Sequence, residues 1–137
     1  MAFKAVESST KKDSNRQLLS SKNLRELQHE IKTHVQQYFK KNLGKGVETT
    51  KVIILDDMLI IRVECFLTDM EKFILTTPGG EVAVKLARMA VAKQSVKDNL
   101  PYFEEKLKAK SFYQNFDVDP ATDFGYCIII FDQTLTE

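Results

Sequence analysis

Two glycine-containing turns have residue types that could bind an anion, and the first is Gly44-Lys45-Gly46. A phosphate-binding loop follows a strand and precedes a helix, so that backbone N–H groups and the helix N-terminus converge on the anion. Here the order is reversed, because the glycines follow an amphipathic helical pattern and precede a strand. The spacing of a P-loop is also absent. We therefore expect this segment to turn the chain.

The second glycine pair, Gly79-Gly80, stands at the start of a long helical pattern. The N–H groups at a helix start can donate hydrogen bonds to a carboxylate, bicarbonate or phosphate. Arg88 lies two turns further along and could face the same region, although helix capping alone also explains the glycines. The sequence leaves open a small-anion site formed by Gly79, Gly80 and Arg88.

No other set of residues has the spacing of a metal or catalytic site. His29 and His34 are five residues apart on one helix, whereas a helical metal pair needs three or four. Asp117, Asp119 and Asp123 lack the glycine and glutamate of an EF-hand, and turn chemistry accounts for them. No serine lies in a nucleophile elbow, and nothing brings two carboxylates into one cleft. We expect no metal and no cofactor, and the case for an enzyme is weak but open.

Composition indicates a single intracellular domain. The chain has 137 residues, 43% of them hydrophobic, which suffices for one core. Its 20 basic and 19 acidic residues leave a net charge of +1, so nucleic acid is not an expected partner. Cys65 and Cys127 fall in apolar runs and are expected to be buried, reduced thiols. With no transmembrane segment and no signal-peptide core, we expect a cytoplasmic protein.

The periodicities predict an α+β fold. Residues 1–21 have the composition of a mobile N-terminal tail, and residues 22–137 form one domain. A helix capped by Asn23 ends at Gly44, strands 47–55 and 58–67 meet at Asp56-Asp57, and a capping box at Thr68 begins a short helix. A long helix follows from Glu81 to about Lys108, with a kink or short break expected before Pro101. Two strands, from Phe112 and over 124–131, complete the order α-β-β-α-α-β-β. This order predicts a four-stranded antiparallel sheet with helices packed on one face.

The long helix also carries a near-heptad apolar stripe with alanines beside it. Such a stripe lets a second helix approach closely, so it predicts a homodimer. Arg62 is a further candidate for a contact surface. The residues of the predicted dimer seam are Ala83, Leu86, Ala87, Met89, Ala90 and Val96.

Several short motifs together resemble the MpsC-like family over residues 25–132. They are Gly44-Lys45-Gly46, Asp56-Asp57, Leu67-Thr68 with Glu71, Arg88, and Asp119-Pro120. The family consists of small bacterial proteins with a domain of unknown function. It is named for a component of a Na+-translocating, membrane-potential-generating system, whose other members resemble a proton-channel-like subunit and a partner implicated in inorganic-carbon uptake.

The resemblance implies a soluble, non-catalytic accessory or regulatory subunit of a membrane ion or inorganic-carbon transport system. It supplies no catalytic residue. This chain has Val47 where the family often has a proline, and its "TTPGGE" turn is a second departure. The alternative is a small-anion or small-ligand-binding sensor, or a cryptic enzyme.

Overall fold

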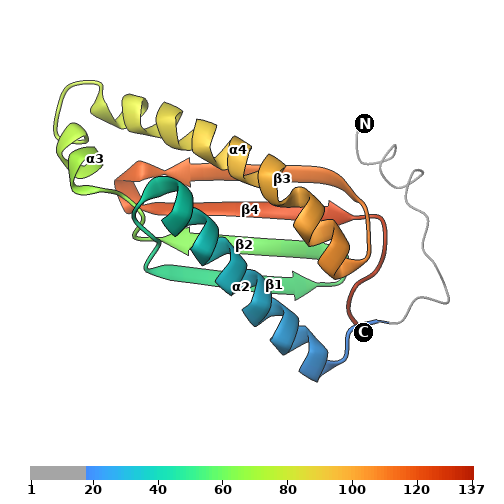
Figure 1. Cartoon of the computed structure of the whole chain (residues 1–137). Coiled ribbons are helices and arrows are strands. Elements are labelled where there is room, and N and C mark those ends of the chain that lie inside the picture. Colours follow the sequence, from blue (N-terminus) through green and yellow to red (C-terminus); the bar gives the residue numbers. More distant parts are fainter. Residues whose placement is uncertain (1–17) are drawn as a thin grey trace.

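The computed structural model describes residues 18–137 (Figure 1). The predicted tail falls mostly on residues 1–17, outside the described part. The element order confirms the predicted α-β-β-α-α-β-β succession, with one short 3-10 helix, η1, added between the last two strands. The elements are α2 (Ser21–Leu43), β1 (Thr49–Leu55), β2 (Met58–Glu64), α3 (Asp69–Ile74), α4 (Gly80–Leu107), β3 (Ser111–Asp119), η1 (Pro120–Thr122) and β4 (Phe124–Phe131).

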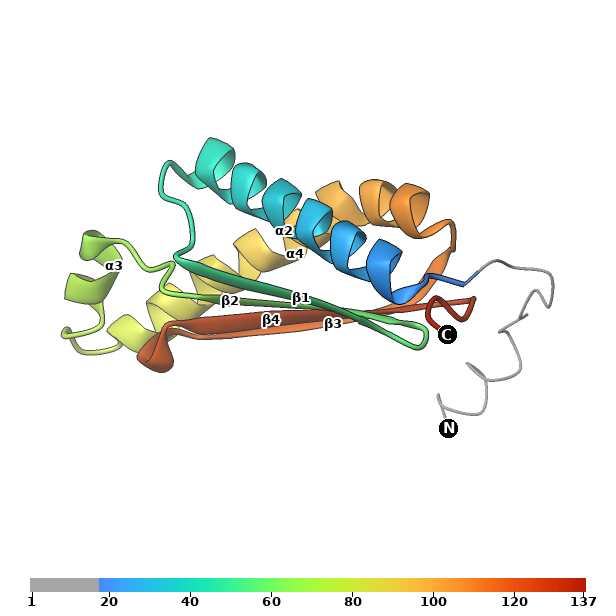
Figure 2. The same ribbon diagram turned by 90° about the horizontal axis from the view of Figure 1, so that it is seen from below.

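The four strands form one antiparallel sheet, as predicted, and the structure gives their order in it as β1-β2-β4-β3. The first hairpin turns at Asp56-Asp57, where Leu55 pairs with Met58 and Asp56 adopts a φ of 58°. Strands β2 and β4 are central, so the two hairpins join along their later strands. Helices α2 and α4 both lie on one face of this sheet (Figure 2).

The main core lies between this face and the two helices. Alternate residues of β1 are buried, as expected when one face of a strand is covered. Helix α2 contributes Ile31 and Val35, and α4 contributes Phe103 and Leu107. Leu135, after the last strand, is fully buried in the same cluster. Both ends of the described chain meet there, because the Leu19 N–H donates to the Leu135 carbonyl at 2.9 Å.

The predicted N-cap of α2 is wrong, whereas its predicted C-terminal end is correct. Ser20, not Asn23, is the N-cap, and its hydroxyl accepts from the Asn23 N–H at 3.3 Å. Several polar residues in this stretch can act as an N-cap. The helix begins at Ser21, three residues earlier than the predicted cap allows, so Ser20 takes that role. Gly44 ends the helix with a φ of 76°, and its N–H donates to the Lys40 carbonyl, which confirms the predicted C-terminus.

Helix α4 runs without interruption through Pro101, so the predicted break is absent. Pro101 is exposed. The carbonyl of Lys97, which would otherwise accept a bond from residue 101, can therefore be hydrated at little cost. Among residues 18–137, no helix has the length and apolar content needed to cross a membrane.

Two strand predictions need correction. Strand β2 ends at Glu64, and the next residue, Cys65, is exposed with a φ of 59°. The expectation of a buried Cys65 was wrong because the apolar run continues past the point where the chain leaves the sheet. Asp117 and Asp119, expected in a loop, belong to β3, which extends to the start of η1.

Candidate functional site

A cluster of polar contacts joins α4 to the segment between β2 and α3. Its centre is Arg88, which is only 8% exposed. The Arg88 Nε donates to Glu71 Oε2 at 2.7 Å, and Nη2 donates to Glu71 Oε1 at 2.6 Å. Nη2 also donates to the Phe66 carbonyl at 3.1 Å, and the guanidinium lies 5.0 Å from the Phe66 ring centroid. This is a two-pronged, charge-assisted ion pair of the kind that fixes geometry strongly.

Glu71 belongs at the same time to the capping box of α3. Its Oε1 accepts from the Thr68 N–H and hydroxyl, both at 2.9 Å, and its own N–H donates to Thr68 Oγ1 at 3.2 Å. Burial acts to raise the pKa of Glu71, but hydrogen bonds from Arg88 and Thr68 outweigh it, so the pKa lies below its usual value. Glu71 is thus held as a carboxylate by both partners.

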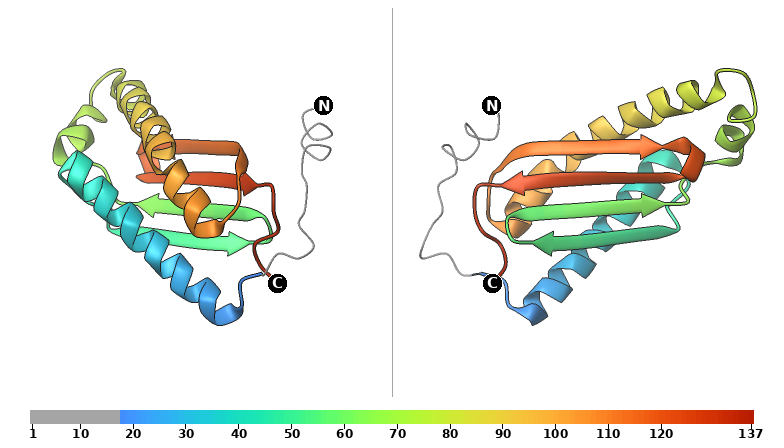
Figure 3. Two further views of the ribbon diagram at one scale, coloured as in Figure 1. Left: turned by 45° about the vertical axis from the view of Figure 1, so that its right-hand side comes forward. Right: turned by 180° about the vertical axis from the view of Figure 1, so that it is seen from behind.

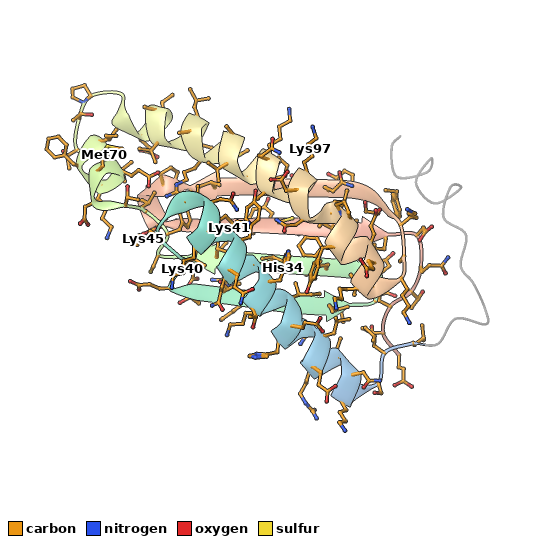
Figure 4. All side chains as sticks on the ribbon, viewed as in Figure 1. His34, Lys40, Lys41, Lys45, Met70 and Lys97 are labelled. Atoms are coloured by element: carbon orange, nitrogen blue, oxygen red, sulfur yellow. The ribbon has the colours of Figure 1, made fainter. Side chains whose placement is uncertain are left out.

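The segment 65–68 is also held from two other loops. Asp123, which follows η1, accepts through Oδ1 from the Phe66 and Leu67 N–H groups at 2.9 and 3.1 Å. Lys45, in the turn after α2, donates from Nζ to the Leu67 carbonyl at 2.6 Å. Lys45 follows the C-terminal end of α2, whose last turn carries Lys40 and Lys41 (Figure 4). The glycine-lysine turn therefore positions an ammonium group on protein backbone.

The structure does not bring the three residues of the possible anion site together. Gly79 is the N-cap of α4 with a φ of 74°, and the Gly80 N–H donates to the Thr77 carbonyl at 3.0 Å. A Cβ at Gly80 would lie 1.7 Å from the Ile74 carbonyl oxygen, so this glycine permits a close approach of α3 and α4. The Arg88 guanidinium lies two turns away and is paired with Glu71. The pair carries no net charge to attract an anion.

The predicted dimer seam is divided between two sides of α4. Ala83, Leu86, Ala87 and Ala90 are exposed. Met89 instead packs on the small cluster of Phe66, Leu67, Val84 and Val118, and Val96 lines a cleft over the sheet. Successive helix residues are about 100° apart, so the six positions spread over roughly half of the helix circumference, and only part of that arc faces the sheet.

Exposed large apolar side chains gather on α3 and on the first half of α4. We call Met70, Phe73, Val82 and Leu86 the helix patch; each is between 64% and 71% exposed. Figure 4 places Met70 on α3, beyond the end of the sheet. The contacts of Arg88 and Glu71 fix the helix that carries Met70 and Phe73.

A mostly apolar cleft of about 80 Å³ lies between α2, α4 and the sheet. It was not predicted, since its walls come from separate elements, and they include Val35, Phe39, Ile61, Val91, Phe116 and Cys127. Burial raises the pKa of the Cys127 thiol to about 12, so this wall offers no thiolate at neutral pH.

Beside the cleft, polar contacts join α2 to α4. The His34 ring stacks on Tyr102 at a centroid distance of 3.6 Å, and its Nε2 lies 2.7 Å from Asn99 Oδ1. The Tyr38 hydroxyl donates to Asp98 at 2.7 Å. Burial and this bond raise the pKa of Tyr38 to about 12. Figure 4 shows His34 between the two helices, and the residue is partly buried there.

Within residues 18–137, no group of three or more His, Cys, Asp or Glu side chains is arranged to hold a metal ion. Asp119 instead caps η1 through the Ala121 N–H, and Asp123 binds backbone as described above. The fold thus defines a small α+β protein in which the charged residues of the polar cluster hold loops and helices in place.

The family model described as "Na+-translocating membrane potential-generating system (MpsC)" matches residues 23–133, so the chain belongs to the MpsC family. The chain is also similar to the "Uncharacterized protein YrhF" of Bacillus subtilis (strain 168). The two are 24% identical over 110 residues, which cover 80% of this chain and 90% of that protein. No solved structure matches.

Most of the motifs that resemble the family converge on the polar cluster, whereas Asp56-Asp57 forms the turn of the first hairpin and binds the C-terminal segment. Lys45 binds the Leu67 carbonyl, Thr68 and Glu71 form the capping box, Arg88 binds Glu71, and Asp119-Pro120 begins the 3-10 turn that leads to Asp123. Residues separated by some 80 positions in the chain thus support one segment, 65–68. The motifs describe how α3 is attached to the rest of the fold.

Proposed function

We propose that the protein is a non-catalytic accessory or regulatory subunit of a membrane ion or inorganic-carbon transport system, acting from the cytoplasmic side. Membership of a family named for a Na+-translocating, membrane-potential-generating system supports the proposal. The structural observation that carries it is the helix patch. It is an exposed apolar surface on helices that the polar cluster holds rigidly.

The residue types of the helix patch suit a protein contact. Phe73 and Met70 are aromatic and flexible apolar anchors of the kind enriched at interfaces. Charged neighbours, Asp69, Lys72 and Lys85, provide a polar rim. Because Arg88 and Glu71 attach α3 to α4, the patch is organised before a partner arrives, which lowers the entropic cost of binding.

Four of the six residues of the predicted dimer seam are exposed on the same helix as Val82, and Leu86 is one of them. A homodimer through Ala83, Leu86 and Ala87 is therefore the competing use of this surface. Both uses bury Leu86, and the transport proposal differs in requiring a second kind of protein.

The test is affinity capture of the tagged full chain from its own cells, including gently solubilised membranes, followed by mass spectrometry. We expect transport-system subunits with the wild-type chain and their loss with Phe73→Asp, because a charge would replace the buried anchor. Lys93→Asp is the matched control on an exposed polar position of α4 and retains them. Equal recovery with wild type and Phe73→Asp would contradict this use of the helix patch.

The cleft between α2 and α4 favours a second candidate, a small-ligand sensor. Its walls suit an apolar ligand of a few carbon atoms, not the anion considered from the sequence. Calorimetric titration with n-butanol, and with bicarbonate as the polar comparison, separates the two ligand classes. Heat with n-butanol that Ala92→Phe abolishes would support the cleft, and no heat with either would remove the sensor.

A further inference from the structure

The face of the sheet opposite α2 and α4 is crossed by no described helix. Figure 3 shows this face from behind, with all four strands in view, and Figure 2 shows both helices on the other side. A four-stranded antiparallel sheet can leave one face in water when that face is polar. Here half of the open face is apolar.

The strand register defines the apolar half. One row across the sheet is Leu55, Met58, Ile130 and Tyr113, and the next is Ile53, Ile60, Ile128 and Asn115. Leu55, Ile53 and Tyr113 are between 46% and 56% exposed. We call the seven apolar residues of these rows the sheet patch: Ile53, Leu55, Met58, Ile60, Tyr113, Ile128 and Ile130.

The other half of the open face is charged, with opposite signs at its two edges. Its first row is Lys51, Arg62, Tyr126 and Asp117, and the second is Thr49, Glu64, Phe124 and Asp119. The β1 edge carries the positive Lys51, the β3 edge carries the negative Asp117 and Asp119, and β2 between them carries one charge of each sign, Arg62 and Glu64. Arg62 is paired with Glu64 at 2.8 Å and lies 5.0 Å from the Phe124 ring centroid, and Asp117 lies 3.5 Å from Lys85 Nζ.

We propose that this face binds a second copy of the chain, about a two-fold axis that runs parallel to the strands between β2 and β4. Rotation about this axis leaves each row at the same position along the strands. It places β1 opposite the partner's β3, and β2 opposite the partner's β4. The sheet patch then covers the partner's sheet patch, with Ile60 opposite the partner's Ile128. Lys51 comes opposite the partner's Asp117, and the face is complementary to itself.

The other in-plane axis, perpendicular to the strands, is disfavoured by the same pattern. It would set the two apolar rows against the two charged rows, those of Lys51 and Glu64, which would desolvate charges without pairing them. Sheets that pack face to face are usually rotated by about 30° relative to each other. With the axis parallel to the strands, this rotation changes the facing residues only at the corners of the interface.

The size of the face suits a dimer. Four strands spaced by about 4.8 Å and seven residues rising about 3.3 Å each give a footprint of roughly 19 by 23 Å. Corrugation by the side chains makes the accessible surface larger than this projected area. The projected footprint of about 440 Å² is roughly half of the ~800 Å² per partner that a standard interface buries, which places this dimer contact at the small end of specific interfaces.

This arrangement leaves the helix patch free, so the interface goes beyond the proposed function and does not depend on it. The sheet interface also places the dimer contact elsewhere than the predicted seam on α4. The two surfaces lie on different sides of the molecule and can be tested separately.

The first test is the molar mass of the full chain by light scattering over a concentration series. We expect wild type to have twice the mass of the chain, and Ile128→Lys to have half the wild-type value. Leu86→Lys, an equally apolar-to-charged change on α4, retains the wild-type mass. Circular dichroism establishes that each variant is folded.

A charge exchange tests the orientation without touching the apolar rows. Lys51→Glu is expected to raise the dimer dissociation constant about tenfold by opposing the partner's Asp117. The double variant with Asp117→Lys restores the wild-type value, because the pair is reformed with reversed signs. A wild-type chain that is monomeric at every concentration would overturn the proposal. So would an Ile128→Lys variant with wild-type mass, or a double variant no tighter than Lys51→Glu.

Discussion

Arg88 and Glu71 show how two charged residues can serve the fold without leaving a charge to bind a ligand. Their side chains are 10% and 14% exposed, and each forms several hydrogen bonds. A buried pair of this kind adds little compared with two apolar residues, but removal of one partner leaves the other uncompensated. The stability of the fold therefore requires Arg88 and Glu71 together.

Replacement of Arg88 by Met is expected to lower the free energy of unfolding by about 3 to 5 kcal/mol, because Glu71 would stay buried without its cation. Urea unfolding of the two proteins measures the difference. Lys85→Met, at a half-exposed position on the same helix, is the control and is expected to cost under about 1 kcal/mol. Equal small losses for both variants would show that Arg88 is not structural.

The lowered pKa of Glu71 predicts a pH dependence. A carboxyl whose folded-state pKa lies below its usual 4.5 stabilises the fold fully above that pH. The contribution declines as the pH falls through the folded-state pKa. The stability difference between wild type and Glu71→Gln should therefore shrink below about pH 4.5 in denaturation series. A difference that grows on acidification would contradict the assignment.

At the scale of elements, the junction of α3 and α4 depends on one glycine. Gly80 starts α4 against the last turn of α3, and it lies too close to the Ile74 carbonyl oxygen for any Cβ. The helices therefore pack through backbone at this point. This contact, together with Arg88, determines where Met70 and Phe73 are presented.

Gly80→Ala should therefore destabilise the protein by about 3 kcal/mol, even though alanine favours helix formation, because α3 must move. Thermal or urea unfolding checks this. Gly46→Ala is the matched control, since no atom lies within 4 Å of a Cβ there, and it should change stability by less than about 1 kcal/mol. A neutral Gly80→Ala would mean that the two helices are not in backbone contact.

At the scale of the whole molecule, the C-terminal segment closes the core. Leu135 is 0% exposed, its N–H donates to the Asp56 carbonyl at 2.7 Å, and its carbonyl accepts from Leu19. It thus links the first hairpin, the start of α2 and the end of the chain.

Leu135→Ala is expected to cost about 3 kcal/mol in unfolding free energy, because it creates a cavity in the main core. Leu86→Ala makes the same chemical change at an exposed position and should alter stability by less than about 0.5 kcal/mol. Chemical denaturation compares the two. Similar costs would place Leu135 outside the core.

Element types and their order could be predicted because local rules govern them. The period of apolar residues identified α2 and α4, Gly44 ended α2, and Thr68 with Glu71 began α3. These signals act within a few residues. The two errors at strand ends, Cys65 and Asp117, arose where an apolar or acidic run crosses a boundary that hydrogen bonding to another strand decides.

Sequence by itself determined the family, the α+β class, the C-terminal glycine of α2 and the capping box of α3, because motif spacing and periodicity are properties of neighbouring residues. Only the tertiary structure decided that Arg88 pairs with Glu71, that the stripe on α4 divides between two sides, and that half of the open sheet face is apolar. Each of these depends on residues that are distant in the chain. Their juxtaposition follows from strand order and helix packing, which no local pattern encodes.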